Sequence, residues 1–177
     1  MKKIYLLSVV FLLMLFSCSL FDNANSVDLD SSLSMDIPIV VNELSAISLK
    51  SAASFPFSET GYASLAEDED LSDYLDKIKS IDINSVKVSF YGLQEGQVIE
   101  SVSLTVSGVG EIANITNVTS NNTMYTPTIS SSKLKQVADY LKENLEISAT
   151  VSGSTNSAPM YFSVYNEFDI TVTAKAL

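Results

Sequence analysis

MYFSVYNEFDITVTA, residues 160–174, is the stretch of sequence that decides the fold. Apolar side chains occupy alternate positions over most of its length, namely Phe162, Val164, Phe168, Ile170, Val172 and Ala174. Successive side chains of a β-strand point to opposite faces, so this spacing places all of them on one face. The pattern predicts a long strand with one face in a hydrophobic core and the other face exposed.

Shorter stretches with the same alternation indicate further strands. They cover residues 33–41, 86–91, 98–106, 111–119 and 145–152, with a short strand near 47–49. Pro38 places the first of them at a sheet edge, because proline cannot donate a backbone hydrogen bond. Gly92 and Gly96 predict a turn that joins the second and third as a hairpin. The remainder of residues 43–66 is expected to form a loop.

Two segments carry helical spacing instead. The first has apolar side chains at i, i+3, i+4 and i+7, namely Leu71, Tyr74, Leu75 and Ile78. The second repeats helical spacing at Leu134, Val137, Ala138 and Leu141. Asp68 or Asp70 can cap the first helix. Ser131 or Ser132 can cap the second, and Asn144 is its expected end.

Residues 33–177 are therefore expected to form one mainly β domain. The many short strands and the turn signals between them favour an antiparallel β-sandwich with two short helices at its ends. An open α+β sheet is the alternative. The length of this segment is typical of a single domain with a sizeable core.

The charge of the chain makes one class of partner unexpected. The sequence has a formal net charge of −11, with 10 lysines and no arginine or histidine. An acidic chain repels phosphate backbones, so nucleic acid is not an expected partner. The charge also disfavours docking on anionic lipid. Its simplest role is solubility, and a cationic partner is the alternative.

The missing residue types remove most familiar catalytic devices. Without histidine, Ser-His-Asp and Cys-His nucleophilic catalysis and the usual general base near neutral pH are excluded. Without arginine, the bidentate clamp for carboxylates and phosphates is absent. A zinc site would need carboxylates alone, which zinc rarely accepts. We therefore expect no enzyme and no bound cofactor.

The N-terminus has the features of an export signal. Lys2 and Lys3 precede an apolar run, Ile4 to Phe16, of 13 residues. That run is shorter than the roughly 20 residues that a membrane-spanning helix needs. A positive start, a short apolar core and a small residue before the cleavage point describe a secretory signal peptide.

The segment Leu15-Phe16-Ser17-Cys18 resembles the lipobox of bacterial lipoprotein signal peptides. Leucine three positions before the cysteine and serine immediately before it match that pattern, whereas Phe16 replaces the usual small residue. The resemblance implies that residues 1–17 are removed and that Cys18 receives the lipid, the only added group expected. It also implies a cell-envelope location, and Ser19, in place of an aspartate, favours the outer membrane.

The segment that follows the cysteine fits a tether. Residues 18–32 are rich in Ser, Asn and Asp and are expected to link the lipidated N-terminus flexibly to the domain. Two or three acyl chains anchor a protein stably, whereas one is marginal. An ordinary secretory signal and an uncleaved anchor are the alternatives. After cleavage, eight lysines face 21 acidic residues, a side-chain charge of −13.

Candidate ligand-binding residues lie on the polar faces of the predicted strands. Tyr91, Tyr161 and Tyr165 have the parity opposite to their apolar neighbours, and they could form an aromatic surface for sugar or peptide. Cross-strand packing is the simpler role for tyrosine in a strand. Glu167 and Asp169 share the same face, and such a pair could serve a glycosidase, although nothing else in the sequence supports that.

An acidic run near residue 70 could bind calcium through Asp68, Asp70 and Asp73. Its spacing does not fit an EF-hand, and acids at the start of a helix favourably complement the helix dipole. The leading hypothesis is therefore a lipid-anchored binding or structural protein that contacts another protein or a surface polymer. A glycan- or calcium-binding module is the alternative.

The lipobox makes a direct prediction about the mature N-terminus. We expect the first residue of the exported protein to be Cys18, with acyl chains on its thiol and amino group. Mass spectrometry of the N-terminal peptide from membrane-extracted protein measures this. An unmodified N-terminal peptide would contradict the prediction.

Overall fold

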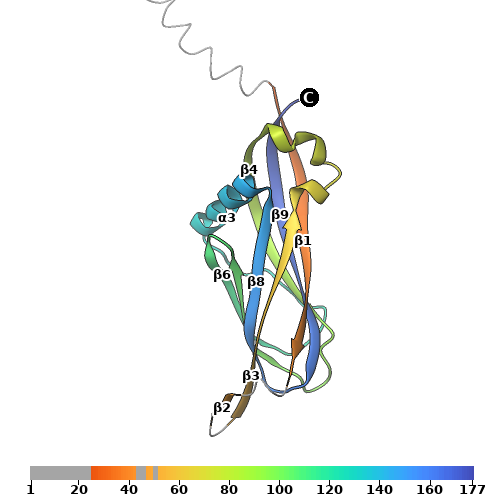
Figure 1. Ribbon diagram of the computed structural model, residues 1–177, viewed down its shortest axis with the longest axis vertical. Helices are drawn as coiled ribbons and strands as arrows, with labels where there is room; N and C mark the ends of the chain where they lie inside the picture. The colour runs from red at the N-terminus through yellow and green to blue at the C-terminus, as the bar shows by residue number, and fades with distance from the viewer. Residues whose placement is uncertain (1–24, 43–46, 50–51) are drawn as a thin grey trace, which may run out of the picture.

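A computed structural model describes residues 25–42, 47–49 and 52–177, and there two antiparallel sheets pack face to face (Figure 1). The predicted β-sandwich is therefore confirmed. The first sheet has the strand order β1-β9-β4-β7 and the second has the order β2-β3-β8-β5-β6. The leader and Cys18 lie outside the described residues.

The first sheet is built around the strand on which the sequence analysis started. β9 (Met160–Lys175) pairs along its length with β1 (Ser26–Val41) on one side and with β4 (Ile78–Tyr91) on the other. β7 (Met124–Tyr125) adds two residues beyond β4. The second sheet contains β2 (Ile47–Leu49), β3 (Ala52–Ser64), β8 (Glu146–Thr155), β5 (Ile99–Val106) and β6 (Gly110–Val118).

The core lies between the sheets and is filled by the alternating apolar residues. The six alternating apolar residues that predicted β9 are all buried. Among them, Phe168, Val164 and Val172 have no exposed surface. Phe90 of β4 is also fully buried, and the rings of Phe57 and Phe162 meet edge to face at 5.4 Å across the two sheets. Aromatic pairs in this geometry add stability beyond the area that they bury.

One of the two predicted helices is present as an α-helix. α3 (Ser131–Asn144) packs against β4 and buries Val137, Ala138 and Leu141. Its cap is Ser130 and not the predicted Ser131 or Ser132, because the Ser130 hydroxyl accepts a hydrogen bond from the Lys133 N–H.

The first predicted helix is replaced by two 3₁₀ turns, η2 (Leu65–Glu67) and η3 (Ser72–Lys77). Neither Asp68 nor Asp70 is the N-cap of η3, which is Leu71; the Asp68 carboxylate instead accepts hydrogen bonds from the N–H groups of Asp70 and Leu71 in the turn before η3. A six-residue turn is too short to carry the i+7 position that the prediction used, and Ile78 already belongs to β4.

Three further predictions about the chain path are wrong. Residues 26–32 were expected in the tether, yet they pair with β9 as the first part of β1. The predicted loop after residue 50 is mostly strand β3. The segments before and after Gly92 and Gly96 do not form a hairpin, because β4 belongs to the first sheet and β5 to the second.

The sandwich is elongated, and β1 spans it from end to end. β1 starts at the end where the C-terminus lies, since Ser26 pairs with Lys175, and it runs to the opposite end (Figure 1). At about 3.4 Å per residue, the 16 residues of β1 cover about 50 Å. Across the described residues, no helix is both long and apolar enough to cross a bilayer.

The close approach of two strands makes Gly153 a sensitive position. A Cβ atom there would lie 1.9 Å from the carbonyl oxygen of Ser101. We expect Gly153→Ala to lower the free energy of unfolding by about 1–3 kcal/mol, because the backbone of β5 must move. Urea titration measures this, and Ser152→Ala on the same strand should change it by less than about 0.5 kcal/mol. Equal stability of the two variants would contradict the expectation.

Candidate functional site

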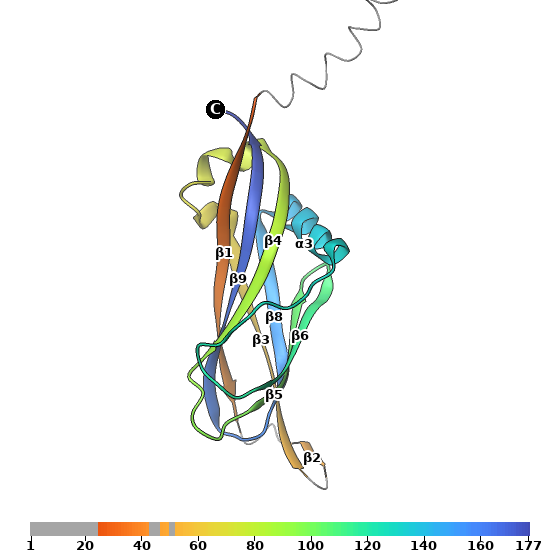
Figure 2. The same cartoon turned by 180° about the vertical axis from the view of Figure 1, so that it is seen from behind.

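The outer face of the first sheet gathers most of the chemistry that the sequence analysis singled out. β9 contributes its odd-numbered residues to this face, from Tyr161 through Asp169 to Lys175. Figure 2 shows the strands of this sheet in front of the second sheet. The face has a polar half towards the end where the C-terminus lies and an aromatic half towards the far end.

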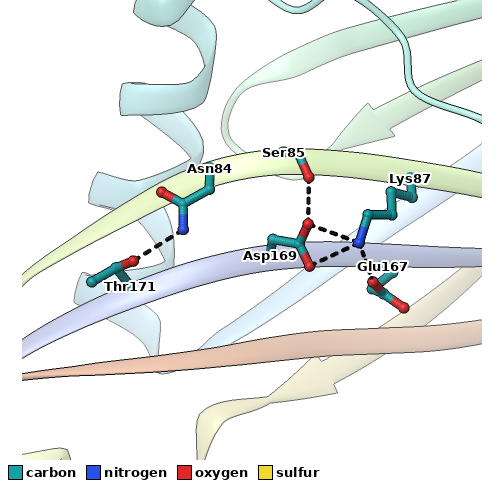
Figure 3. Close-up of polar contacts among 6 residues, drawn as sticks. All are labelled: Asn84, Ser85, Lys87, Glu167, Asp169 and Thr171. Carbon is teal, nitrogen blue, oxygen red and sulfur yellow. Dashed lines mark hydrogen bonds and ion pairs between the residues drawn. The ribbon is translucent and has the colours of Figure 1, made fainter.

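A Lys87 ion-pair cluster lies near the middle of this face, where the polar half meets the aromatic half (Figure 3). Its ammonium group lies 2.8 Å from Glu167 Oε1 and 2.9 Å from Asp169 Oδ2. The Ser85 hydroxyl donates a hydrogen bond to the same Asp169 oxygen. The three charged side chains are 25–30% exposed, so the pairs are neither buried nor freely solvated.

A β-bulge in β4 brings these partners to one face. The register of β4 against β9 shifts between Ile83 and Ser85, so the inward residues change from odd to even numbers. Asn84 and Ser85 therefore both reach β9, where the Asn84 amide donates to the Thr171 hydroxyl at 3.0 Å. Bulges commonly re-aim side chains in this way.

The cluster shifts the pKa values of its members. The hydrogen bond from Ser85, followed by the one from Lys87, holds the pKa of Asp169 below its ordinary value of 3.8. Hydrogen bonds to Glu167 and Asp169 raise the pKa of Lys87. A glycosidase acid needs the opposite shift, a raised carboxyl pKa. Asp169 thus has the features of a structural ion-pair partner of Lys87.

The aromatic half contains all three tyrosines from the sequence analysis. Tyr91 on β4 stands opposite Ser163 on β9, which lies between Tyr161 and Tyr165 on the same face. Residues diagonal to one another on neighbouring strands are about 7–8 Å apart at their Cα atoms. The sheet register therefore brings Tyr161, Tyr91 and Tyr165 into a zigzag row.

Two aliphatic residues extend this row to the flanking strands. Val40 on β1 pairs with Tyr161, and Met124 on β7 pairs with Ser89 beside Tyr165. Of the described large hydrophobic residues, these two are among the most exposed, at 49% and 61%. Tyr161 is 64% exposed and Tyr91 is 42% exposed. We call Val40, Tyr91, Met124, Tyr161 and Tyr165 the tyrosine platform.

Sequence reasoning missed the two aliphatic members of the platform. Val40 shares the outward parity of the polar residues before it, Ser34 and Asp36, but nothing in the apolar run Ile39-Val40-Val41 marks it as a binding residue. Met124 lies in a two-residue strand inside a loop-like region. Its outward position follows from Tyr125, which makes an edge-to-face contact with the buried ring of Phe90.

Side-chain amides fix the loop that follows Tyr91. The Asn121 side chain accepts a hydrogen bond from the Leu93 N–H and donates one to the Leu93 carbonyl. Asn156 makes the same kind of contacts further along, with the Val98 N–H at 2.9 Å and the Gly96 carbonyl at 3.1 Å. Both ends of the loop beside the platform are thereby held by the neighbouring loops.

The structure does not assemble the predicted calcium ligands. The Asp68 carboxylate is occupied by the N–H groups of Asp70 and Leu71 and by the Ser31 hydroxyl. Within residues 25–42, 47–49 and 52–177, no group of three His, Cys, Asp or Glu residues is placed to hold a metal ion. Asp73 lies in η3, where the Lys77 ammonium group bonds its backbone carbonyl.

Comparisons with known proteins define no family for the chain. No family model matches it, and no curated protein matches it. Similar solved structures include Desmodium yellow mottle tymovirus, with 11% identity, 85% of this chain and 84% of that chain covered, and a TM-score of 0.37. The Macrobrachium rosenbergii nodavirus particle has 8% identity, coverage of 86% and 95%, and a TM-score of 0.36.

A third similar structure is TmCBM61 in complex with β-1,4-galactotriose. It has 12% identity, coverage of 85% and 88%, and a TM-score of 0.30. These TM-scores are all below 0.5, so the likeness carries no information about ligand or assembly. The properties of this chain therefore have to be argued from its own residues.

The Ser85 contact predicts a measurable acid dependence. A depressed carboxyl pKa stabilises the folded state above the ordinary pKa, and that contribution is lost as the pH falls through the folded-state value. We expect Ser85→Ala to raise the pKa of Asp169 towards 3.8 and to destabilise the protein more at about pH 7 than at about pH 2. An NMR titration of the Asp169 carboxyl carbon, with urea unfolding at both pH values, measures this.

The matched control for that experiment is Thr173→Val. This variant removes another hydroxyl of the same strand face, one that bonds Asp28 at 2.7 Å rather than Asp169. Its Asp169 titration should match that of the unaltered protein. An unchanged Asp169 titration in the Ser85 variant would contradict the assigned role of the hydroxyl.

Proposed function

We propose that the chain is a lipid-anchored, non-enzymatic binding protein of the bacterial cell envelope, which contacts another protein or a surface polymer through the tyrosine platform. The observation that carries this proposal is the platform itself. Four large apolar side chains, Val40, Tyr91, Met124 and Tyr161, are exposed side by side on one sheet face. Contiguous apolar surface of this kind commonly marks a binding site.

The position of the platform fits a tethered protein. Cys18, the proposed lipid attachment residue, precedes Ser26 by eight positions, and Ser26 starts β1 at the end opposite to the platform. Val40 lies 14 residues further along the same extended strand, about 45 Å away. A protein held at its N-terminus would thus present the platform away from the membrane, and Ser19 favours the outer membrane as that membrane.

The polar half of the same face supports a role without catalysis. Lys87 forms ion pairs with both Glu167 and Asp169, and the pKa of Asp169 is lowered rather than raised. The sequence has no histidine to act as a general base near neutral pH. The polar half is best understood as a network that fixes β4 and β9 against each other next to the platform.

A glycan-binding module is the second candidate, and one observation favours it. Three tyrosines of adjacent strands form a row on the outer sheet face, with Tyr91 and Tyr161 exposed and Tyr165 half-buried. Tyrosine offers an apolar ring face together with a hydroxyl group, a combination that suits sugars as well as peptides. Calcium binding has no comparable support among the described residues.

Binding of envelope material tests the platform. We expect Tyr161→Ala to weaken the association of the full-length protein with envelope preparations from the native cells by about tenfold, as for a central aromatic residue of a binding site. Tyr62→Ala is the matched control, because Tyr62 is 68% exposed on β3 of the other sheet. Co-sedimentation measures the association, and equal binding by the two variants would contradict the proposal.

A further inference from the structure

We propose that the tyrosine platform binds a neutral, extended polysaccharide whose chain runs along β9, with sugar rings stacked on Tyr161, Tyr91 and Tyr165. This inference rests on the function proposed above and names the chemical class of its ligand. It follows from the spacing of the rings, the openness of the surface, the hydroxyl groups around it and its charge.

The three tyrosines follow the direction of a linear ligand. Tyr161 and Tyr165 are four residues apart on one strand, about 13 Å. Tyr91 lies beside the midpoint of that distance, because its partner is Ser163. The rings therefore mark out a row longer than one sugar, which several consecutive sugars of a chain can contact. Each pyranose ring has an apolar C–H face that packs on an aromatic ring.

The platform is an open sheet face, which suits a polymer rather than a small molecule. Four hollows of about 200–600 Å³ occur elsewhere on the described surface. They lie between β1 and β3, beside the C-terminus and along α3, and no platform residue lines any of them. Small molecules usually bind in enclosed pockets. A polymer can instead bind an open surface through contacts made by several of its consecutive units.

Hydroxyl and charged groups lie beside the rings, where sugar hydroxyls would need partners. Ser163 lies in the middle of the row, and Asp36 on β1 is the partner of Tyr165. Lys87 and Glu167 lie opposite each other on β4 and β9, two residues along the strands from Ser89 and Tyr165, and their ion pair holds them in place. Groups that are already ordered lose little entropy when a ligand binds, which favours affinity.

The charge of the protein selects a neutral polymer over an anionic one. The mature chain carries eight lysines against 21 acidic residues. The lysine nearest the platform in the sheet register, Lys87, is neutralised by Glu167 and Asp169. An anionic polysaccharide would therefore find repulsion and no free cation beside the described platform residues.

The size of the platform favours a polysaccharide over a folded protein. A standard protein interface uses about 20–30 residues on each side. The platform consists of five large residues, with Ser163, Ser89, Pro38 and Asp36 between and beside them. A narrow aromatic row with polar flanks matches the width of one glycan chain.

Affinity electrophoresis of the full-length protein tests this inference. The gels contain galactan, mannan or β-glucan as neutral probes and polygalacturonate as the anionic probe. We expect at least one neutral probe to retard the protein and polygalacturonate not to. Tyr161→Ala and Tyr91→Ala should each weaken the retardation by about tenfold, and Tyr62→Ala should leave it unchanged.

A footprint on the unaltered protein provides an independent readout. Tetranitromethane nitrates exposed tyrosines, and peptide mass spectrometry then reports each site. The retarding polysaccharide should protect Tyr91 and Tyr161 but not Tyr62. This comparison within one chain does not depend on how well a variant folds.

The outcomes separate the ligand class from the general function. If no neutral probe retards the protein, while Tyr161→Ala still loses binding to envelope preparations, the inferred polysaccharide ligand is overturned. That result would indicate a protein partner. Retardation by polygalacturonate alone would overturn the charge argument and with it the inference. If the platform variants keep both envelope binding and retardation, both proposals are overturned together.

Discussion

The structure depends on the register of β9. This strand is central in its sheet and pairs with β1 and β4 along almost its whole length. One of its faces supplies Val164, Phe168 and Val172 to the core, and a slip of one residue against either neighbour would turn that face to solvent. Burial of the even-numbered side chains therefore fixes where every odd-numbered side chain must lie.

The register of β9 also determines which side chains lie on the outer face of the sheet. Because Phe168 is locked inward, Glu167 and Asp169 must point outward, and the bulge in β4 brings Ser85 and Lys87 to meet them. The same register places the tyrosines of β4 and β9 in one row at the far end. The spacing of the tyrosines in the platform is thus set by the hydrophobic core behind the sheet.

Much of this was visible in the sequence, and the failures have physical causes. Strict alternation gave β9, and helical spacing gave α3, because each bears one continuous apolar face. β3 was missed because Pro56 and Gly61 interrupt it and because its alternating face is weak, with Phe57 and Ala63 its buried side chains among residues 54–64. The supposed hairpin failed because a turn signal does not say whether the chain returns to the same sheet. Val40 and Met124 lie in the platform because β1 and β7 pair with β9 and β4, and the local sequence pattern does not predict which strands pair.

The span of β1 has a mechanical consequence. A protein tethered before Ser26 and bound at the far end of β9 would carry any pull between membrane and ligand across the β1–β9 pairing. The two strands are antiparallel with 16 paired positions, and the pull would act along them in opposite directions. All the hydrogen bonds between them would then be loaded together in shear instead of opening one after another. The β1–β9 pairing would thus be the part of the fold that resists such a pull.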